Sequence, residues 1–221
     1  MGGWSSRLKT DPKFHNHKLQ TMAITFEKQS FSGHFPEIWR GECKMLPGGF
    51  KPKHELPVGT VVRRATPVFV NFDDMSAAIC KTASVLDGGT TTKVRVPKGH
   101  YFAKGDSVAK HGDAATDPVT VNDIDKSNSA YDVLTLSKAI TGIAKDDIII
   151  EAVKDGATVK AAYEPNMVVG ADKNFDGRGL PTIDAAFEAV VLMPSLMFPI
   201  LPEWKTGVSL KLNPNIIFIK Q

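Results

Sequence analysis

The sequence predicts a mainly β protein: a barrel or sandwich of short strands with an extended N-terminal arm and one short C-terminal helix. Three observations support this prediction. Short β-branched runs alternate with turn residues over 56–155, residues 1–55 show no sustained hydrophobic period, and residues 181–193 have helical spacing. With 221 residues, the chain can form one large domain or two small ones with a core of their own.

Residues 1–55 are predicted to form the arm, because prolines and aromatic side chains are scattered along them without a period. Disordered chains are poor in aromatics, so this composition indicates an extended segment that inserts side chains into the pockets of a surface. The surface could belong to the chain's own globular part, although we favour another subunit. The candidate partner-binding residues are Trp4, Phe14, Phe31, Phe35 and Trp39.

Residues 56–155 are predicted to form the β-barrel or sandwich domain, since strand-like runs recur there about every 8–12 residues. One phrase is repeated: "VGTVV" at 58–62, "KGDSV" at 104–108 and "KDDII" at 145–149 share one form. Each has a turn residue, then a polar residue, then a strand, so we interpret the phrase as a structural corner. The alternative is a pair of Asp-bearing catalytic loops, but neither loop has a partner His or a metal-ligand spacing beside it.

Residues 156–221 are predicted to form a C-terminal segment with a helix at 181–193 and a terminal strand at 215–221. Within 181–193, apolar residues recur at the i, i+3, i+4, i+7 and i+8 positions of one helical face, and Pro194 would end the helix. The terminal "NIIFIKQ" is apolar enough that we expect it to pair with another strand.

The positive charge of the chain is concentrated near its N-terminus. Residues 1–60 hold nine Lys and Arg against five Asp and Glu, whereas residues 61–221 hold 18 against 19. A basic arm can bind an acidic protein surface or nucleic acid. An excess of four charges over 60 residues is weak for nucleic acid, so we expect none as a partner.

Cysteine content and hydrophobic segments indicate a protein made in a cytoplasm. Cys43 and Cys80 form no CxxC pair, and two distant thiols suit a reducing compartment. The first 20 residues have no apolar stretch typical of a secretory signal. The longest apolar run, at 189–204, is interrupted by three prolines, so no membrane-spanning helix is expected.

No catalytic, cofactor-binding or metal site is predicted. The most suggestive motif is "DKNFDGRGLPTID" at 172–184, in which Asp172, Asn174, Asp176 and Gly177 match the start of a calcium loop. Its twelfth position is Ile183 instead of a carboxylate, so we favour a plain Asx or Gly turn. The chain contains no phosphate-binding glycine loop, no HExxH and no GxSxG, and we expect it not to be an enzyme.

Two stretches suggest a family: "VPKGHYFAKGDSVAK" and "VTVNDIDKSNSAYDVLTLSKAITGIAKDDIIIEA". With the preceding arm and "LPVGTVVRRATPVFVNF", this part of the chain resembles the auxiliary head proteins of tailed bacteriophages, namely the capsid decoration and head-fibre proteins of Bacteroidetes phages. The resemblance covers residues 56–155 best. It implies a non-enzymatic virion protein, made in the host cytoplasm, that binds the major capsid protein on the capsid surface as a homo-oligomer, often a trimer.

Two other functions stay open at the level of sequence. A carbohydrate- or cell-surface-binding β module would use exposed aromatic side chains as stacking platforms, and the candidates are Tyr101, Phe102, Tyr131 and Trp204. A small β-rich hydrolase would use the Asp-bearing loops, but it lacks a recognisable base, nucleophile and metal site.

Overall fold

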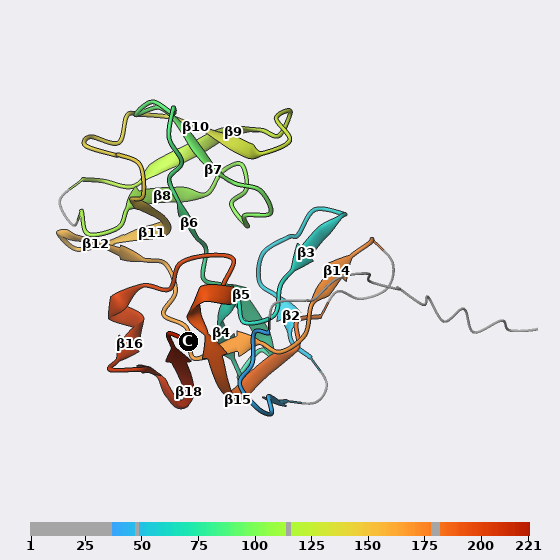
Figure 1. The fold of residues 1–221 in the computed structure, drawn as a ribbon. Helices are drawn as coiled ribbons and strands as arrows, with labels where there is room; N and C mark the ends of the chain where they lie inside the picture. The colour runs from blue at the N-terminus through green and yellow to red at the C-terminus, as the bar shows by residue number, and fades with distance from the viewer. Residues whose placement is uncertain (1–36, 47–48, 114–115, 178–181) are drawn as a thin grey trace, which may run out of the picture. The chain divides into compact units, whose positions relative to one another are not determined.

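The computed structural model describes residues 37–46, 49–113, 116–177 and 182–221, and this part of the chain is mainly β (Figure 1). The prediction of a mainly β protein is therefore confirmed. The described residues contain two short helical turns, η1 (Met193–Ser195) and η2 (Pro202–Trp204). No helix among them is long and apolar enough to cross a membrane.

The larger of the two main sheets has nine strands drawn from both ends of the described chain. Its strands, in order of pairing, are β16 (Lys205–Thr206), β17 (Ser209–Leu210), β18 (Asn213–Ile219), β15 (Ala185–Leu192), β13 (Met167–Val169), β4 (Pro67–Asn71), β5 (Ser76–Ile79) and β2 (Lys51–Pro52), with β1 (Lys44–Met45) also paired to β15. Strand β18 runs parallel to β15, so the predicted terminal strand is present and paired.

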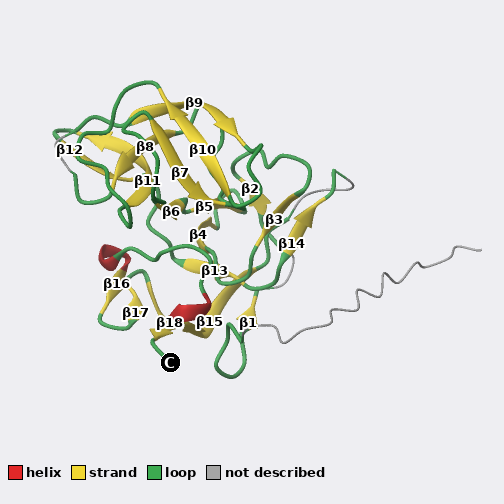
Figure 2. Ribbon diagram, turned by 45° about the horizontal axis from the view of Figure 1, so that its top comes forward, coloured by secondary structure: helices red, strands yellow, loops and turns green. Residues whose placement is uncertain are grey.

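The second main sheet has seven strands and is formed by the middle of the chain (Figure 2). Its order is β12 (Thr158–Ala161), β11 (Ile148–Asp155), β8 (Ser107–Lys110), β9 (Val119–Asp125), β10 (Tyr131–Leu136) and β7 (Lys93–Pro97), with β6 (Thr82–Ser84) paired to β11. A separate pair joins β3 (Thr60–Val62) and β14 (Lys173–Phe175). The predicted domain boundary after residue 155 instead falls inside the β11–β12 hairpin.

Both sheets contribute to the same hydrophobic core. One buried cluster combines Val68 and Ile79 of the nine-stranded sheet with Val94 and Leu134 of the seven-stranded sheet. All four side chains are at most 2% exposed. Burial of this apolar surface is the main term that stabilises the fold, at about 25 cal/mol per Å² removed from water.

The predicted helix at 181–193 is wrong, because this segment contains the eight-residue strand β15. β15 lies inside the sheet, where it pairs with β13, β18 and β1. A strand with neighbours on both sides and cover on both faces has apolar residues at nearly every position, and such a run also contains helical spacings. The β-branched Val190 and Val191 favour the extended conformation.

The predicted arm of residues 1–55 differs from the structure where it is described. Residues 1–36 lie outside the described residues. From residue 37 on, the segment is part of the chain's own sheet, since β1 pairs with β15 and β2 pairs with β5. Phe50, which lies between β1 and β2, is only 1% exposed. This aromatic residue of the predicted arm therefore packs in the core of its own chain.

The repeated phrase forms the same turn at all three positions, which confirms its interpretation as a corner. The four-residue turns are 57–60, 103–106 and 144–147, so each begins one residue before the quoted phrase. In each turn the third residue has a positive φ: 88° at Gly59, 95° at Gly105 and 67° at Asp146. The fourth residue donates its N–H to the carbonyl of the first, over 3.0, 3.1 and 3.3 Å for Thr60, Asp106 and Asp147. A strand follows each turn, namely β3, β8 and β11.

The two turns that end in aspartate share a further hydrogen bond. The backbone N–H of Ala103 donates to Oδ2 of Asp106 at 2.7 Å, and that of Ala144 donates to Oδ2 of Asp147 at 2.7 Å. A carboxylate that accepts a backbone N–H within its own turn holds the turn closed. The phrase thus encodes both the backbone conformation and the side chain that locks it.

Candidate functional site

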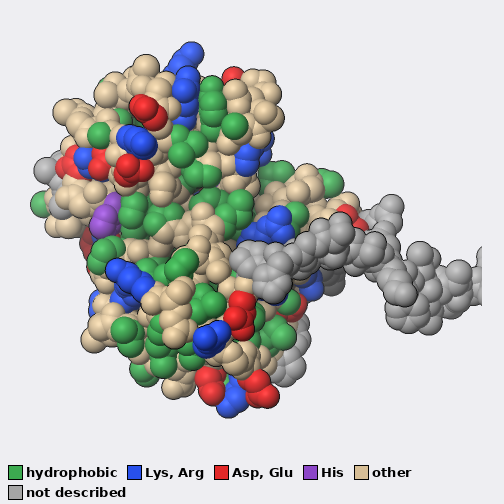
Figure 3. Space-filling model, in the orientation of Figure 1, with side chains coloured by type: hydrophobic (Ala, Val, Ile, Leu, Met, Phe, Trp, Pro, Cys, Tyr) green, Lys and Arg blue, Asp and Glu red, His purple; other side chains and the backbone are tan. Residues whose placement is uncertain are grey.

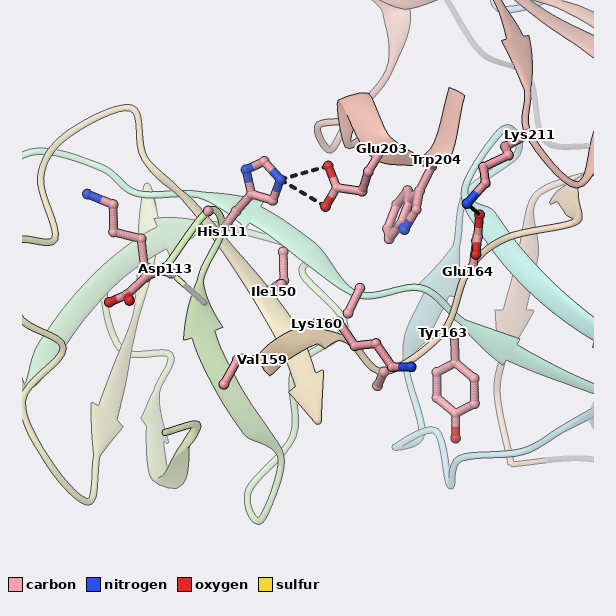
Figure 4. A pocket seen from close by; sticks show the side chains of 14 residues that line it. His111, Asp113, Ile150, Val159, Lys160, Tyr163, Glu164, Glu203, Trp204 and Lys211 are labelled. Carbon is pink, nitrogen blue, oxygen red and sulfur yellow. Dashed lines mark hydrogen bonds and ion pairs between the residues drawn. The ribbon is translucent and has the colours of Figure 1, made fainter. Parts of the chain in front are cut away.

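A groove of about 530 Å³ lies beside the edge strand β12 (Figure 4). One wall consists of β12, Ile150 of β11 and the turn that follows β8. The other consists of Glu203 and Trp204 of η2 together with Lys211. The groove therefore lies where an edge of the seven-stranded sheet faces the segment that leads into β16.

Two close polar side-chain contacts cross the groove. Nε2 of His111 lies 2.8 and 2.9 Å from the two carboxylate oxygens of Glu203, and Nζ of Lys211 lies 2.9 Å from Oε1 of Glu164. In Figure 4 each basic side chain points towards its acidic partner from the opposite wall. The pairs hold the walls together and place charged groups of both signs where a ligand would enter.

Tyr163, at one end of the groove, is surrounded by other side chains. Its ring stacks on Phe69 at a centroid distance of 6.2 Å and meets His54 edge-on at 5.6 Å, with Nζ of Lys53 at 5.4 Å. Burial, followed by the charge of Glu151, raises the pKa of the Tyr163 phenol. Burial, followed by the charge of Lys81, lowers the pKa of His54. Near neutral pH, both groups are therefore uncharged hydrogen-bonding groups.

Strand β12 gives the groove a free backbone edge within the described part of the chain, because it pairs there only with β11. An open edge can accept an extended peptide by strand addition. Lys160 at this edge forms an ion pair with Asp155, and charged side chains on an edge oppose unspecific pairing. The groove is thus suited to a polar or extended ligand.

Charged side chains of both signs are interspersed over the face of the described residues shown in Figure 3. Residues 1–36 hold five Lys and Arg against two Asp and Glu, which leaves 22 of each sign from residue 37 on. The whole formal charge of +3 therefore belongs to the first 36 residues.

The predicted partner-binding residues are distributed as follows. Trp4, Phe14, Phe31 and Phe35 lie outside the described residues. Trp39 is half-buried, forms a β-bridge with Val191 and packs against a hydrophobic cluster of its own chain. Its ring therefore anchors the start of the described chain on β15.

Three of the four predicted stacking platforms are buried. Tyr101, Phe102 and Trp204 are 6%, 4% and 2% exposed, so none presents a ring face to solvent. Tyr131 is half-buried, and the Arg95 guanidinium lies 4.6 Å from its ring centroid. A ligand that stacks on aromatic rings would have to use other residues.

The first part of the calcium-like motif contains the strand β14, and its residues 178–181 lie outside the described residues. Asn174 belongs to β14, which pairs with β3, and Asp172 accepts the backbone N–H of Arg64 at 2.7 Å. Ile183 is fully buried and forms a bridge with Phe50. Where a calcium loop would curl round an ion, Lys173–Phe175 instead form a paired strand.

Sequence reasoning missed the groove because its partners are far apart along the chain. His111 and Glu203 are separated by 92 residues, and nothing in the local sequence of either marks the pair. Only the sheet order brings them together.

The fold and the groove define a two-sheet β protein with a polar groove at a sheet edge. Comparison of the chain with models of known protein families, with curated proteins and with solved structures finds no match.

Proposed function

We propose that the chain is a non-enzymatic structural protein of a tailed-phage particle, which binds the outer surface of the capsid through its N-terminal residues. In this proposal the partner is the major capsid protein, and residues 37–221 form the barrel or sandwich body of a decoration or head-fibre protein. The sequence resemblance suggests the class. The observation that carries the proposal is the way the start of the described chain is attached to β15.

This attachment, over residues 38–46, follows β15 along much of its length. The carbonyl of Ile38 accepts the N–H of Leu192 at 2.9 Å, the N–H of Arg40 donates to Val190 at 2.8 Å, and β1 continues the pairing. Nζ of Lys44 lies 2.9 Å from the carboxylate of Glu188. The chain at residue 37 is therefore attached to an interior strand of the sheet. A force applied through the preceding residues would act on that strand and on the core behind it.

The composition of residues 1–36 suits contact with a large surface. They carry the net positive charge of the chain and four of the predicted anchors, and fully extended they would span at most roughly 120 Å. Aromatic anchors supply most of the affinity of an interface, whereas lysines contribute steering and register. A stable docking of this kind would bury roughly 1,200–2,000 Å². We expect the bound form to be a homo-oligomer, with the trimer that the resemblance implies.

The test is cosedimentation of the full chain with shells of the major capsid protein of the same phage. A variant in which Trp4, Phe14, Phe31 and Phe35 are all replaced by Ala should bind at least about a hundredfold more weakly, because each of the four lost anchors removes on the order of 1 kcal/mol and tenfold corresponds to about 1.4 kcal/mol. The control is Phe72→Ala, which removes an aromatic ring that is 54% exposed on the described surface. Equal binding by all three proteins, or no binding by the full chain, would contradict the proposal.

A second candidate function is binding of a polar ligand such as a cell-surface carbohydrate, and the groove beside β12 favours it. Charged groups of both signs and the Tyr163 side chain line a hollow of about 530 Å³. Saturation-transfer NMR with a panel of oligosaccharides would test this function. Signals lost in Glu203→Gln and kept in the four-anchor variant would support it, and absence of any signal would reject it.

A further inference from the structure

Lys81 is a lysine with almost no access to solvent, since its side chain is only 2% exposed. It lies between β5 and β6, where the chain passes from the nine-stranded to the seven-stranded sheet. Its carbonyl accepts the backbone N–H of Glu151 at 3.1 Å. An ammonium group taken out of water at such a site requires carboxyl partners to offset its desolvation.

Two carboxyl groups meet the Lys81 amine. Oδ2 of Asp106 lies 2.7 Å from Nζ, Oε1 of Glu151 lies 3.3 Å from it, and these side chains are 13% and 12% exposed. The N–H of Ala103 also holds Oδ2 of Asp106, within the turn before β8. The three side chains come from three different segments, each fixed by the sheets, so the amine and the carboxyl are held in contact.

Glu151 differs from Asp106 in its hydrogen bonding. Its Oε2 is buried and has no hydrogen-bond partner in the described residues. Burial raises the pKa of Glu151, while the neighbouring charge of Lys81 opposes that rise. Its side chain is 12% exposed, so little water reaches the carboxyl group. A carboxyl group in this environment can hold a proton and pass it on.

We propose that Lys81 and Asp106 become joined by an intramolecular isopeptide bond, with Glu151 as the proton-transfer residue. Proton transfer from the Lys81 ammonium to the Asp106 carboxylate first gives a neutral amine and a neutral acid. Nζ then attacks Cγ of Asp106 and a C–N bond forms. Glu151 relays the amine proton to a carboxyl oxygen, the C–O bond breaks and one water molecule leaves. No oxidant or reductant is needed.

The physical conditions favour this condensation over its reversal. Groups held in contact by a rigid scaffold react as if at very high concentration. The three side chains are at most 13% exposed, which limits access of the water that hydrolysis of the amide would need. The burial of His54 lowers its pKa, so this neighbouring ring is neutral and adds no charge to oppose the neutral amine and acid. The proposal does not depend on the proposed capsid function.

The chain contains a matched pair in which we expect no bond. Nζ of Lys110 lies 2.8 Å from Oδ2 of Asp147 in the repeated turn, but these side chains are 27% and 25% exposed. The Lys110 amine is also bound by the carbonyl of Gly142 at 2.8 Å. Water reaches this pair, and the second partner of its amine is a neutral carbonyl instead of a carboxyl group.

The test is the intact mass of the purified full chain under denaturing conditions. Wild type and Asp147→Asn should each be lighter than their sequences by one water molecule, whereas Lys81→Arg and Glu151→Gln should have full mass. Tryptic digestion of wild type should give one product that joins residues 65–93 to residues 105–110, because trypsin does not cut at a linked lysine.

A wild-type mass equal to that of the sequence would overturn the proposal, even if the variants do not fold. A water loss confined to a single peptide would overturn it as well, since an aspartate can also lose water by closing a ring with its own backbone. A linked product in Glu151→Gln at the wild-type yield would overturn the role of Glu151.

Discussion

The turns at 103–106 and 144–147 have the same backbone, and they differ in what surrounds the final aspartate. In both, the aspartate accepts its own turn's N–H at 2.7 Å and binds a lysine amine at 2.7 or 2.8 Å. Lys81 is 2% exposed and binds a second carboxyl, whereas Lys110 is 27% exposed. The same turn can thus serve as a structural corner at both positions and become a candidate reaction site where its lysine is buried and meets a second carboxyl group.

The largest effect should come from removing the buried amine. Lys81→Met leaves Asp106 and Glu151 as two carboxyl groups with neither a cation nor an amide link, in a site that water barely reaches, so we expect a loss of at least about 3–5 kcal/mol in the free energy of unfolding. Lys110→Met, at the half-exposed corner, should cost about 1 kcal/mol or less. Urea unfolding of both variants measures the difference, and equal losses would mean that burial does not separate the two corners.

Removal of the aspartates should give a smaller contrast. Asp106→Ala and Asp147→Ala each lose the hydrogen bond that closes the turn, which costs about 1–2 kcal/mol. Asp106→Ala additionally leaves Lys81 with Glu151 as its one remaining carboxyl, and we expect about 2 kcal/mol more from that. Thermal unfolding of the two variants at pH 7 tests this order, and a larger loss for Asp147→Ala would contradict it.

The backbone of the two corners should respond to substitution in opposite directions. Gly105 has φ 95° and open space where a Cβ would lie, so Gly105→Ala should cost about 1 kcal/mol through backbone strain alone. Asp146 has φ 67°, and Asp146→Gly should stabilise by about 0.5 kcal/mol as that strain is relieved. Urea midpoints that move in the same direction would show that the two turns are not equivalent.

The pH dependence of the two corners should also have opposite signs. The hydrogen bond from Lys110 lowers the pKa of Asp147 below 3.8, so its contribution to stability is present above that pH and is lost as pH falls further. Burial raises the pKa of the Glu151 carboxyl group above 4.5. Its contribution to the free energy of unfolding is therefore present below pH 4.5 and is lost as the pH rises through the raised pKa.

Melting temperatures between pH 3 and pH 8 test these signs. Asp147→Asn should approach wild type as the pH falls towards 3. Glu151→Gln should gain on wild type as the pH rises from about 4.5. Parallel curves for wild type and both variants would contradict the assignment, and Lys154→Gln, which removes an exposed ion pair with Asp117, serves as the surface control.

Sequence patterns predicted the turns, which depend on residues close together in the chain. They did not predict the conformation of 181–193, which depends on strand pairing between distant segments. The prediction of the three turns was confirmed because each turn consists of four consecutive residues that include its own turn-forming residue. The helix at 181–193 was wrong because the neighbours of β15 come from residues 44–45, 167–169 and 213–219. The apolar residues of an interior strand do not reveal those neighbours.

The buried cluster left a trace in the sequence that local patterns could not complete. Lys81 is the one charged residue in "SAAICKTASV" and Glu151 the one in "IIIEAV", and a lone charge in an apolar run suggests a buried partner. The partners are 25 and 70 residues away from Lys81, so the lone charges can be noticed in the sequence, but only the fold pairs them.

The most direct test of the difference between the corners is a crystal structure of the full chain at a resolution that separates bonded from hydrogen-bonded atoms. We predict continuous density between Nζ of Lys81 and Cγ of Asp106, at the amide bond length of about 1.33 Å, and separate density for Lys110 and Asp147. Separate side chains at both corners, each at hydrogen-bond distance, would show that the buried corner is an ion pair like the exposed one.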